Sequence, residues 1–115
     1  MMKRVVTGHD QEGKSVFVSV GEPPRTATSG VGTQITYCWG THSTPVVPDS
    51  GDDPTTVDYI TILSGEIWLV LDTGAEVHLT PGDCVVQNGT QHAWHNRTPD
   101  PCVFVGVQVG ATRQD

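Results

Sequence analysis

The chain has 115 residues, which is enough for one hydrophobic core, so we expect a single domain over residues 1–115. Its 13 glycines, 8 prolines and 36% hydrophobic residues favour short strands joined by tight turns over helices. The formal net charge of −7 argues against nucleic acid and against an anionic membrane surface as partners.

Three strands are expected in the first half of the chain, at residues 5–6, 15–20 and 34–39. There, β-branched and aromatic residues gather between turn signals. Residues 21–32 contain two adjacent prolines and many small polar residues, so we expect a loop. Residues 41–56 are proline-rich and show no regular pattern, and they are expected to be an irregular loop.

The second half is denser in strand signals, and no segment has helical periodicity. Residues 72–74 read Asp-Thr-Gly, which predicts a hairpin turn. About nine short strands in all, roughly ten residues apart, are typical of an antiparallel sandwich or barrel such as a jelly roll. In this half we expect strands at residues 57–63, 66–71, 75–79, 84–86, 92–96 and 102–109.

Residues 81–96 contain the pattern that suggests a site. A Pro-Gly-Asp turn and an Asn-Gly turn enclose a short apolar run, and a further strand follows. His92, Trp94 and Asn96 occupy alternate positions of that strand, so their side chains should point to one face. An imidazole, an indole and a carboxamide on one face predict the wall of a polar pocket.

The same stretch resembles the second sequence motif of the cupin superfamily. In that motif a glycine is followed by a histidine and, four residues later, by an asparagine. Gly89, His92 and Asn96 match this end of the motif, and Gly82 matches its beginning. Gln87 replaces the proline of the turn, and the spacer after Gly82 is one residue short.

The first cupin motif is matched only in part. Gly65 matches its final glycine, and the shorter Asp58 stands at its glutamate position. Depending on the spacer, the two histidine positions of the motif fall on Asp52 and Pro54 or on Gly51 and Asp53, so both histidines are missing.

The resemblance implies an all-β fold, a cupin-like jelly-roll β-barrel of two antiparallel sheets, and often a homodimer. On this reading residues 1–56 supply N-terminal strands and an irregular loop. Residues 57–109 carry the core cupin motifs, and residues 110–115 form a tail.

The resemblance implies a metal site made of three histidines and one glutamate, a ligand set that suits iron, manganese, zinc or nickel. This chain keeps His92 and Asp58, and two ligands do not hold a divalent ion tightly. His95 alternates to the face opposite His92, and His78 lies on a strand face expected to meet solvent. We therefore expect no metal or other cofactor. If a divalent metal is bound, its ligands would be His92, Asp58, His42 and Asp52.

Without a metal, His92 and Asp58 are the candidate catalytic residues. Imidazole transfers protons near neutral pH, and an inward-facing carboxylate could transfer a proton or orient the imidazole. The structural alternative is that Asp58 ends a hydrogen-bond network in the core and that His92 is a barrel histidine with its hydrogen bonds satisfied.

Three tryptophans stand out in a chain whose aromatic residues make up only 6%. They either pack the barrel or form an apolar pocket for a flat or cyclic ligand. The candidate substrate-binding residues are Trp94, Asn96, Trp39, Tyr37, Trp68 and Gln108.

The sequence also bears on the compartment. It contains no 18-residue apolar run and no signal-like start, which favours a cytoplasmic protein. Cys38, Cys84 and Cys102 are odd in number and lack CxxC spacing, so we expect reduced thiols.

Three functions remain open at this stage. The favoured one is a small-molecule enzyme of lyase or isomerase type, with His92 and Asp58 performing acid–base chemistry on an apolar metabolite. Such chemistry would be a dehydration, an isomerisation or a cyclisation. The alternatives are a metal-dependent cupin oxygenase or decarboxylase, and a barrel that binds a small ligand without turnover.

Overall fold

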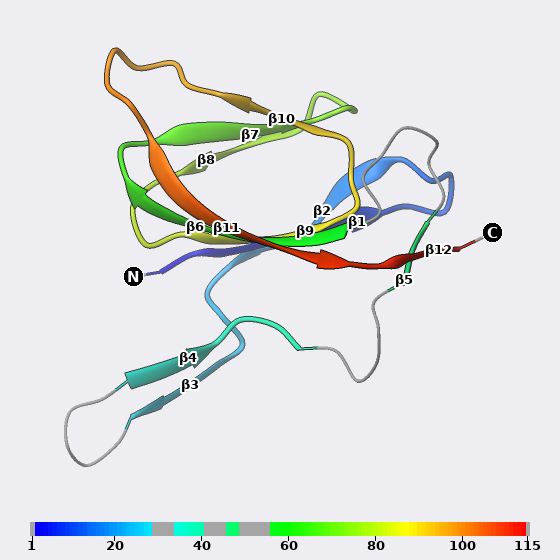
Figure 1. Ribbon diagram of the computed structural model, residues 1–115, viewed down its shortest axis with the longest axis horizontal. Coiled ribbons are helices and arrows are strands. Elements are labelled where there is room, and N and C mark those ends of the chain that lie inside the picture. The colour runs from blue at the N-terminus through cyan, green and yellow to red at the C-terminus, as the bar shows by residue number, and fades with distance from the viewer. Residues whose placement is uncertain (1, 29–33, 41–45, 49–55, 115) are drawn as a thin grey trace.

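The computed structural model describes residues 2–28, 34–40, 46–48 and 56–114, and it places strands but no helix among them (Figure 1). In the described part of the chain no helix is therefore long and apolar enough to cross a membrane. The strands are β1 (Arg4–His9), β2 (Ser15–Gly21), β3 (Arg25–Thr28), β4 (Gln34–Tyr37), β5 (Val46–Pro48), β6 (Thr56–Ser64), β7 (Ile67–Leu71), β8 (Glu76–Leu79), β9 (Cys84–Asn88), β10 (His92–His95), β11 (Val103–Gly110) and β12 (Thr112–Gln114).

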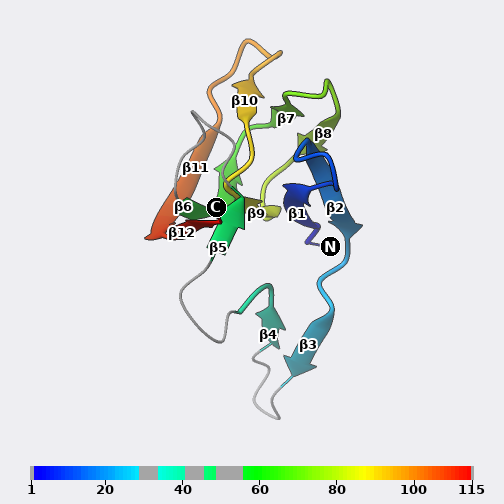
Figure 2. The same ribbon diagram turned by 90° about the vertical axis from the view of Figure 1, so that its right-hand side faces the viewer.

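Two sheets face each other and form the barrel. One has five strands in the order β11-β6-β9-β1-β2, and the other has three in the order β10-β7-β8. All pairs within them are antiparallel except β1 with β9, which is parallel. Figure 2 shows β3 and β4 as a separate hairpin that projects from the barrel, and we call this hairpin the arm. The expected all-β jelly-roll barrel is confirmed.

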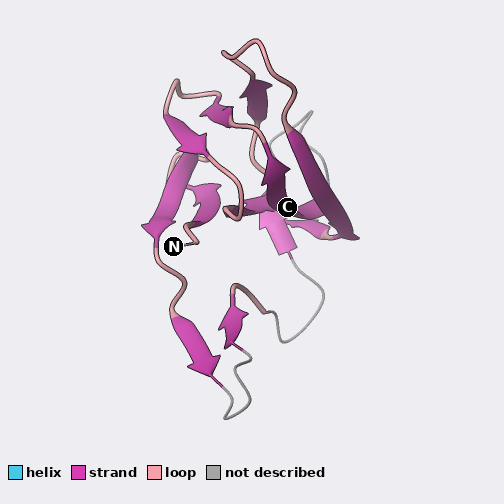
Figure 3. Ribbon diagram, turned by 90° about the vertical axis from the view of Figure 1, so that its left-hand side faces the viewer, coloured by secondary structure: helices cyan, strands magenta, loops and turns pink. Residues whose placement is uncertain are grey.

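Three of these strands were not predicted from the sequence. The arm strand β3 lies within residues 21–32, and β5 lies within residues 41–56; loops were expected in both places. The third, β12, lies inside the expected tail and pairs in parallel with β5. Figure 3 shows the described residues as strands and loops, with no helix among them. Each of these strands is only three or four residues long, and each is defined by its partner strand rather than by its own alternation.

The core lies between the two large sheets, and strand alternation creates it. In β7, Ile67, Leu69 and Leu71 are buried and point inward, while the residues between them are less buried. The inward face of β6 contributes Ile60 and Ile62 to the same core. Apolar side chains from both sheets therefore fill most of the barrel, and the polar side chains that remain inside call for an explanation.

The turn before β9 is held by a buried carboxylate. Asp83 accepts hydrogen bonds from the backbone N–H of Thr80 at 2.8 Å and from that of Lys3 at 3.1 Å. Its Oδ2 also lies 3.2 Å from the ammonium of Lys3. Burial alone would raise the pKa of Asp83, but these hydrogen bonds and the ammonium charge lower it below the ordinary value. The carboxylate therefore joins the turn to the start of β1.

We predict that Asp83→Asn lowers the free energy of unfolding by about 1.5–3 kcal/mol, because a charge-assisted set of hydrogen bonds is lost. The native pKa is lowered, so the stabilisation is present above the unfolded-state pKa and disappears as pH falls through the native value. Urea unfolding of both proteins at a series of pH values measures this. The difference should shrink toward acid pH, and a constant difference would contradict the assignment.

Candidate functional site

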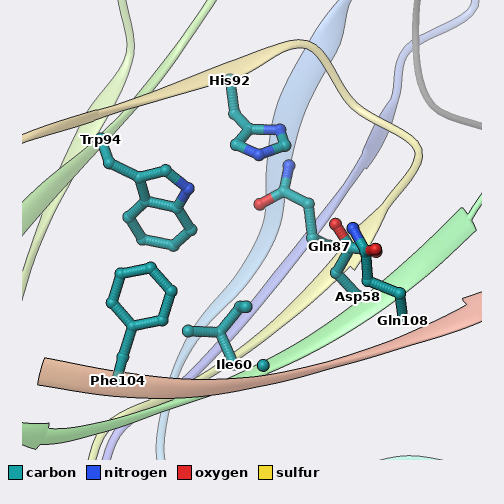
Figure 4. Close-up of a pocket in the computed structure, with 8 residues that line it drawn as sticks. Asp58, Ile60, Gln87, His92, Trp94, Phe104 and Gln108 are labelled. Atoms are coloured by element: carbon teal, nitrogen blue, oxygen red, sulfur yellow. The ribbon is translucent and has the colours of Figure 1, made fainter.

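A pocket of about 310 Å³ opens between the two large sheets (Figure 4). Its floor comes from β6, β9 and β11, and its roof comes from β10. The side chains and backbone that line it belong to Asp58, Ile60, Gln87, His92, Trp94, Phe104, Gly106 and Gln108.

The strand register creates a polar row across the floor. Gln108 on β11 is the pairing partner of Asp58 on β6, and Asp58 is in turn the pairing partner of Gln87 on β9. Directly paired residues present their side chains to the same face of a sheet. The next inward row, which contains Ile60 and Gly106, is apolar. The floor therefore changes from polar to apolar along the strands.

The roof repeats this division. His92 and Trp94 point to the pocket from alternate positions of β10, as predicted. The indole of Trp94 lies 5.2 Å from the ring of Phe104 between centroids, and the imidazole of His92 meets the edge of Trp94 at 5.8 Å. Figure 4 shows the two rings at one end and the polar side chains at the other. The pocket thus suits a molecule with a flat apolar body and a polar group.

A backbone carbonyl holds the imidazole of His92. Nδ1 lies 2.8 Å from the carbonyl oxygen of Thr90, and a carbonyl can only accept a hydrogen bond. In the neutral ring Nδ1 therefore carries the proton, and Nε2 has a free lone pair. The hydrogen-bond partner of this ring nitrogen is thus the backbone carbonyl of Thr90 and not the carboxylate of Asp58.

The carboxyl group of Asp58 and the carboxamide of Gln87, which lie across the pocket from His92, are deeply buried. Asp58 is 7% exposed, and its Oδ1 accepts a hydrogen bond from the hydroxyl of Thr56 at 2.8 Å. Gln87 is 1% exposed, and its amide Nε2 donates to the hydroxyl of Thr90. Its Oε1 has no hydrogen-bond partner among the described residues. A buried acceptor without a donor is costly, so a ligand that supplies an O–H or N–H here would remove that cost.

Four of the six residues predicted to bind substrate do not line this pocket, and Trp68 and Asn96 are the first two of them. Trp68 stands on the outer face of β7, where it stacks on His78 at 4.3 Å between ring centroids and lies 5.2 Å from the guanidinium of Arg97. The carboxamide of Asn96 is exposed and hydrogen-bonds within the turn that follows β10. Strand β10 ends one residue earlier, so alternation no longer directs Asn96 inward.

The remaining predicted residues divide into three groups. Tyr37 and Trp39 line a second pocket at the base of the arm, not the barrel pocket. The possible metal ligands His42 and Asp52 lie outside the described residues. The barrel pocket brings together His92, Asp58, Trp94 and Gln108.

Sequence reasoning missed Gln87, Phe104 and Gly106. Every second residue of a strand faces the same side, so counting back from Gln108 along β11 would have identified Gly106 and Phe104. A Cβ at Gly106 would lie 2.9 Å from Cδ1 of Ile60, so glycine keeps this part of the floor open. Four of the five β9 residues, Gln87 among them, are buried, so no polar–apolar alternation marks its inward face.

The described residues do not fit a metal site. None of them form a group of three or more histidine, cysteine, aspartate or glutamate side chains placed to hold an ion. The barrel pocket offers one imidazole, one carboxylate and two carboxamides. Carboxamides are weak ligands for iron or zinc, and their presence favours hydrogen bonding to an organic molecule.

We predict that neutral His92 carries its proton on Nδ1. Long-range ¹⁵N–¹H NMR correlations at pH 8 should show the Nε2 resonance in the range of an unprotonated imidazole nitrogen and Nδ1 in the protonated range. The exposed His95, which has no comparable ring contact with a carbonyl among the described residues, serves as the internal comparison. A proton on Nε2 would contradict the role assigned to Thr90.

Three curated fungal proteins show similarity to the chain. Two of them, "Phomopsin biosynthesis cluster protein C'" and "Phomopsin biosynthesis cluster protein D" from Diaporthe leptostromiformis, are each 52% identical over 42 residues, which is 36% of this chain and 22% of theirs. The third, "Cupin-domain-containing oxidoreductase fogC" from Aspergillus ruber, is 28% identical over 130 aligned positions, covering 83% of this chain and 64% of that protein. The chain thus spans less than two thirds of each relative's length.

The family model of the cupin domain matches residues 46–108. This match covers more than half of the chain and includes every described residue that lines the barrel pocket. Together with the jelly-roll barrel, it shows that this chain belongs to the cupin domain family.

Proposed function

We propose that the chain is a small-molecule enzyme that performs acid–base chemistry in the barrel pocket, without a metal. The observation that carries this proposal is the hydrogen bond between Nδ1 of His92 and the carbonyl of Thr90. It leaves Nε2 with its lone pair as the base, at a position that lines the pocket.

The two ends of the pocket suggest how a substrate would lie. Trp94 and Phe104 contact each other, and together they would form an apolar wall against which a flat apolar body packs. The buried Oε1 of Gln87 would accept a hydrogen bond from a hydroxyl or amine of the substrate. His92 would then remove a proton from a carbon or oxygen close to that group, and Asp58 on the opposite wall would be the second proton-transferring residue. Dehydration, isomerisation and cyclisation all follow this pattern.

The comparisons support a metabolite as the substrate. The names of two relatives refer to the phomopsin biosynthesis cluster. The polar end of this pocket contains no lysine or arginine among the described residues, which argues against a phosphorylated substrate. We therefore propose a hydroxyl- or carbonyl-bearing apolar metabolite.

Two other functions remain as alternatives. The first is a metal-dependent cupin oxygenase or decarboxylase, with His42 and Asp52 as additional ligands to His92 and Asp58. The relative from Aspergillus ruber is named an oxidoreductase, which agrees with the oxygenase only. A barrel that binds its ligand without turnover would use the same walls. Metal analysis of protein purified without added metal distinguishes the metal-dependent alternative from the metal-free proposal. Stoichiometric iron, manganese, zinc or nickel would contradict the metal-free proposal.

The acid–base proposal predicts proton exchange on a simple probe. We expect the protein to exchange the α-protons of 4-phenyl-2-butanone in D₂O faster than buffer alone does. The loss of the ¹H NMR signal of these protons measures the exchange rate. His92→Gln should lower the exchange rate by about 10²–10⁴-fold, because a general base contributes this much. Asp58→Asn should also lower the rate.

The matched control is His78→Gln. This histidine is exposed, stacks on Trp68 outside the pocket and should leave the exchange rate unchanged. A rate that survives in both pocket variants would contradict catalysis by His92 and Asp58. Binding of the probe without exchange by the unmodified protein would favour the ligand-binding alternative.

We also propose that two copies pair through the outer face of β11. This strand is the edge of the five-stranded sheet, and all its residues are exposed. Val105 and Val107 are 48% and 55% exposed, and they alternate with the pocket residues Phe104, Gly106 and Gln108. A row of exposed valines on a sheet edge is a surface suited to association. Two copies related by a two-fold axis would each cover the valine row of the other.

Sedimentation equilibrium tests the pairing. We expect a mass of about twice the 12.3 kDa of one chain, and we expect Val107→Glu to give the single-chain mass because it places charge in the contact. Val18→Glu, at an exposed valine of β2 on the other sheet edge, is the matched control and should remain paired. A single-chain mass for the unmodified protein would contradict this proposal.

We propose the cytoplasm as the compartment, because an odd number of cysteines without CxxC spacing favours reduced thiols. No disulfide joins Cys38, Cys84 and Cys102 in the described part of the chain. Burial and the neighbouring Cys38 thiol raise the pKa of Cys84 to about 12, so it stays protonated and unreactive at physiological pH.

A further inference from the structure

A second pocket, of about 400 Å³, lies at the base of the arm, and we call it the arm-base pocket. It shares none of its lining with the barrel pocket. Its residues come from β1, from the entry into β3 and from the end of β4 onward. They are Arg4, Pro24, Arg25, Tyr37, Cys38, Trp39 and Gly40.

The guanidinium of Arg4 is a fixed positive charge in this pocket. Its Nη1 donates to the carbonyl of Cys38 at 3.0 Å, and its Nη2 donates to the hydroxyl of Ser19 at 3.3 Å. Its Nε–H is buried and has no hydrogen-bond partner among the described residues. A buried donor attached to a charged group is especially costly when it is unpaired. Arg4 therefore lacks an acceptor that a ligand could supply.

A second guanidinium stands opposite an aromatic wall. The Cζ atom of Arg25 lies 4.5 Å from the ring centre of Tyr37, within the range of a cation–π contact. Tyr37 and Trp39 are 45% and 43% exposed, which is unusual for large aromatic side chains in a small domain. Neither Arg4 nor Arg25 forms an ion pair with the described residues, and no described carboxylate lines the pocket.

We propose that the arm-base pocket binds a small planar aromatic carboxylate. A carboxylate is a flat acceptor that matches the donor geometry of a guanidinium, and it would supply the acceptor that Nε of Arg4 lacks. An aromatic ring attached to it would cover the exposed faces of Tyr37 and Trp39.

The charge of the pocket is the reason to expect an anion. The chain as a whole has a formal net charge of −7, yet this pocket contains two guanidinium groups and no described acid. The barrel pocket has the opposite character, with the carboxylate of Asp58 and no described cation other than the titratable His92. The two pockets therefore select different ligands, and the second binds independently of the chemistry proposed for the first.

The probe pair is benzoate and benzamide, which have the same shape and differ in charge. Calorimetric titration at pH 7 and low salt should show benzoate binding about 10-fold or more tightly than benzamide, because a charge-assisted hydrogen bond contributes about 1.5–3 kcal/mol. Added salt should weaken benzoate binding and leave benzamide binding unaffected. Equal affinities for the two probes would overturn the proposal.

Matched variants locate the site. Arg25→Met keeps the length of the side chain and removes its charge, and it should weaken benzoate binding about 10-fold or more. Arg97→Met makes the same change at the guanidinium that stacks on Trp68, outside both pockets, and should have no effect. His92→Gln should also leave benzoate binding unchanged.

Three outcomes would overturn the proposal. The first is equal loss of benzoate affinity in Arg25→Met and Arg97→Met, which would mean that only net charge matters. The second is loss of affinity in His92→Gln, which would place benzoate in the barrel pocket. The third is a change in sedimentation mass for Arg25→Met, which would show that a second copy of the chain covers the arm base. Near-ultraviolet circular dichroism confirms that each variant remains folded.

Discussion

The barrel pocket depends on the register in which β11, β6 and β9 are paired. Because side chains alternate along a strand, a slip of one residue in β6 would turn Asp58 outward and bring its neighbours inward. The observed pairing instead aligns Gln108, Asp58 and Gln87 in one row. Apolar rows on the same face keep this register, since Ile60 and Ile62 belong to the core. Core packing thus determines where the polar groups can stand.

A chain of hydrogen bonds connects the first strand to His92. The hydroxyl of Thr7 on β1 lies 2.9 Å from the hydroxyl of Thr90, and it also accepts the backbone N–H of Asn88 at 3.0 Å. Gln87 donates to the same Thr90 hydroxyl, and the carbonyl of Thr90 holds the imidazole. Thr7 and Thr90 are both fully buried, so this network is shielded from water. A residue near the start of the chain therefore helps to position the candidate base.

The two pockets of this small barrel differ in the side chains that line them. The barrel pocket has its polar groups on facing sheets, an arrangement that the proposed proton transfer would use on both sides of a substrate. The arm-base pocket collects guanidinium and aromatic groups from segments outside the three-stranded sheet. Because they share no lining residue, each can be changed without direct contact with the other.

The sequence by itself determined the local part of this structure. Alternation and turn residues predicted most strands, a sandwich or barrel and the shared face of His92 and Trp94, because these follow from two-residue periodicity. The inward direction of Asp58 was implied by the resemblance to the cupin motif. Tertiary structure decided the rest. Trp68 faces outward because Leu69 occupies the inward position next to it, and Thr90 orients His92 through a backbone carbonyl that no side-chain pattern reveals. The arm moves its aromatic residues to a second pocket because its strands pair only with each other, and sheet partners cannot be read from short, irregular segments.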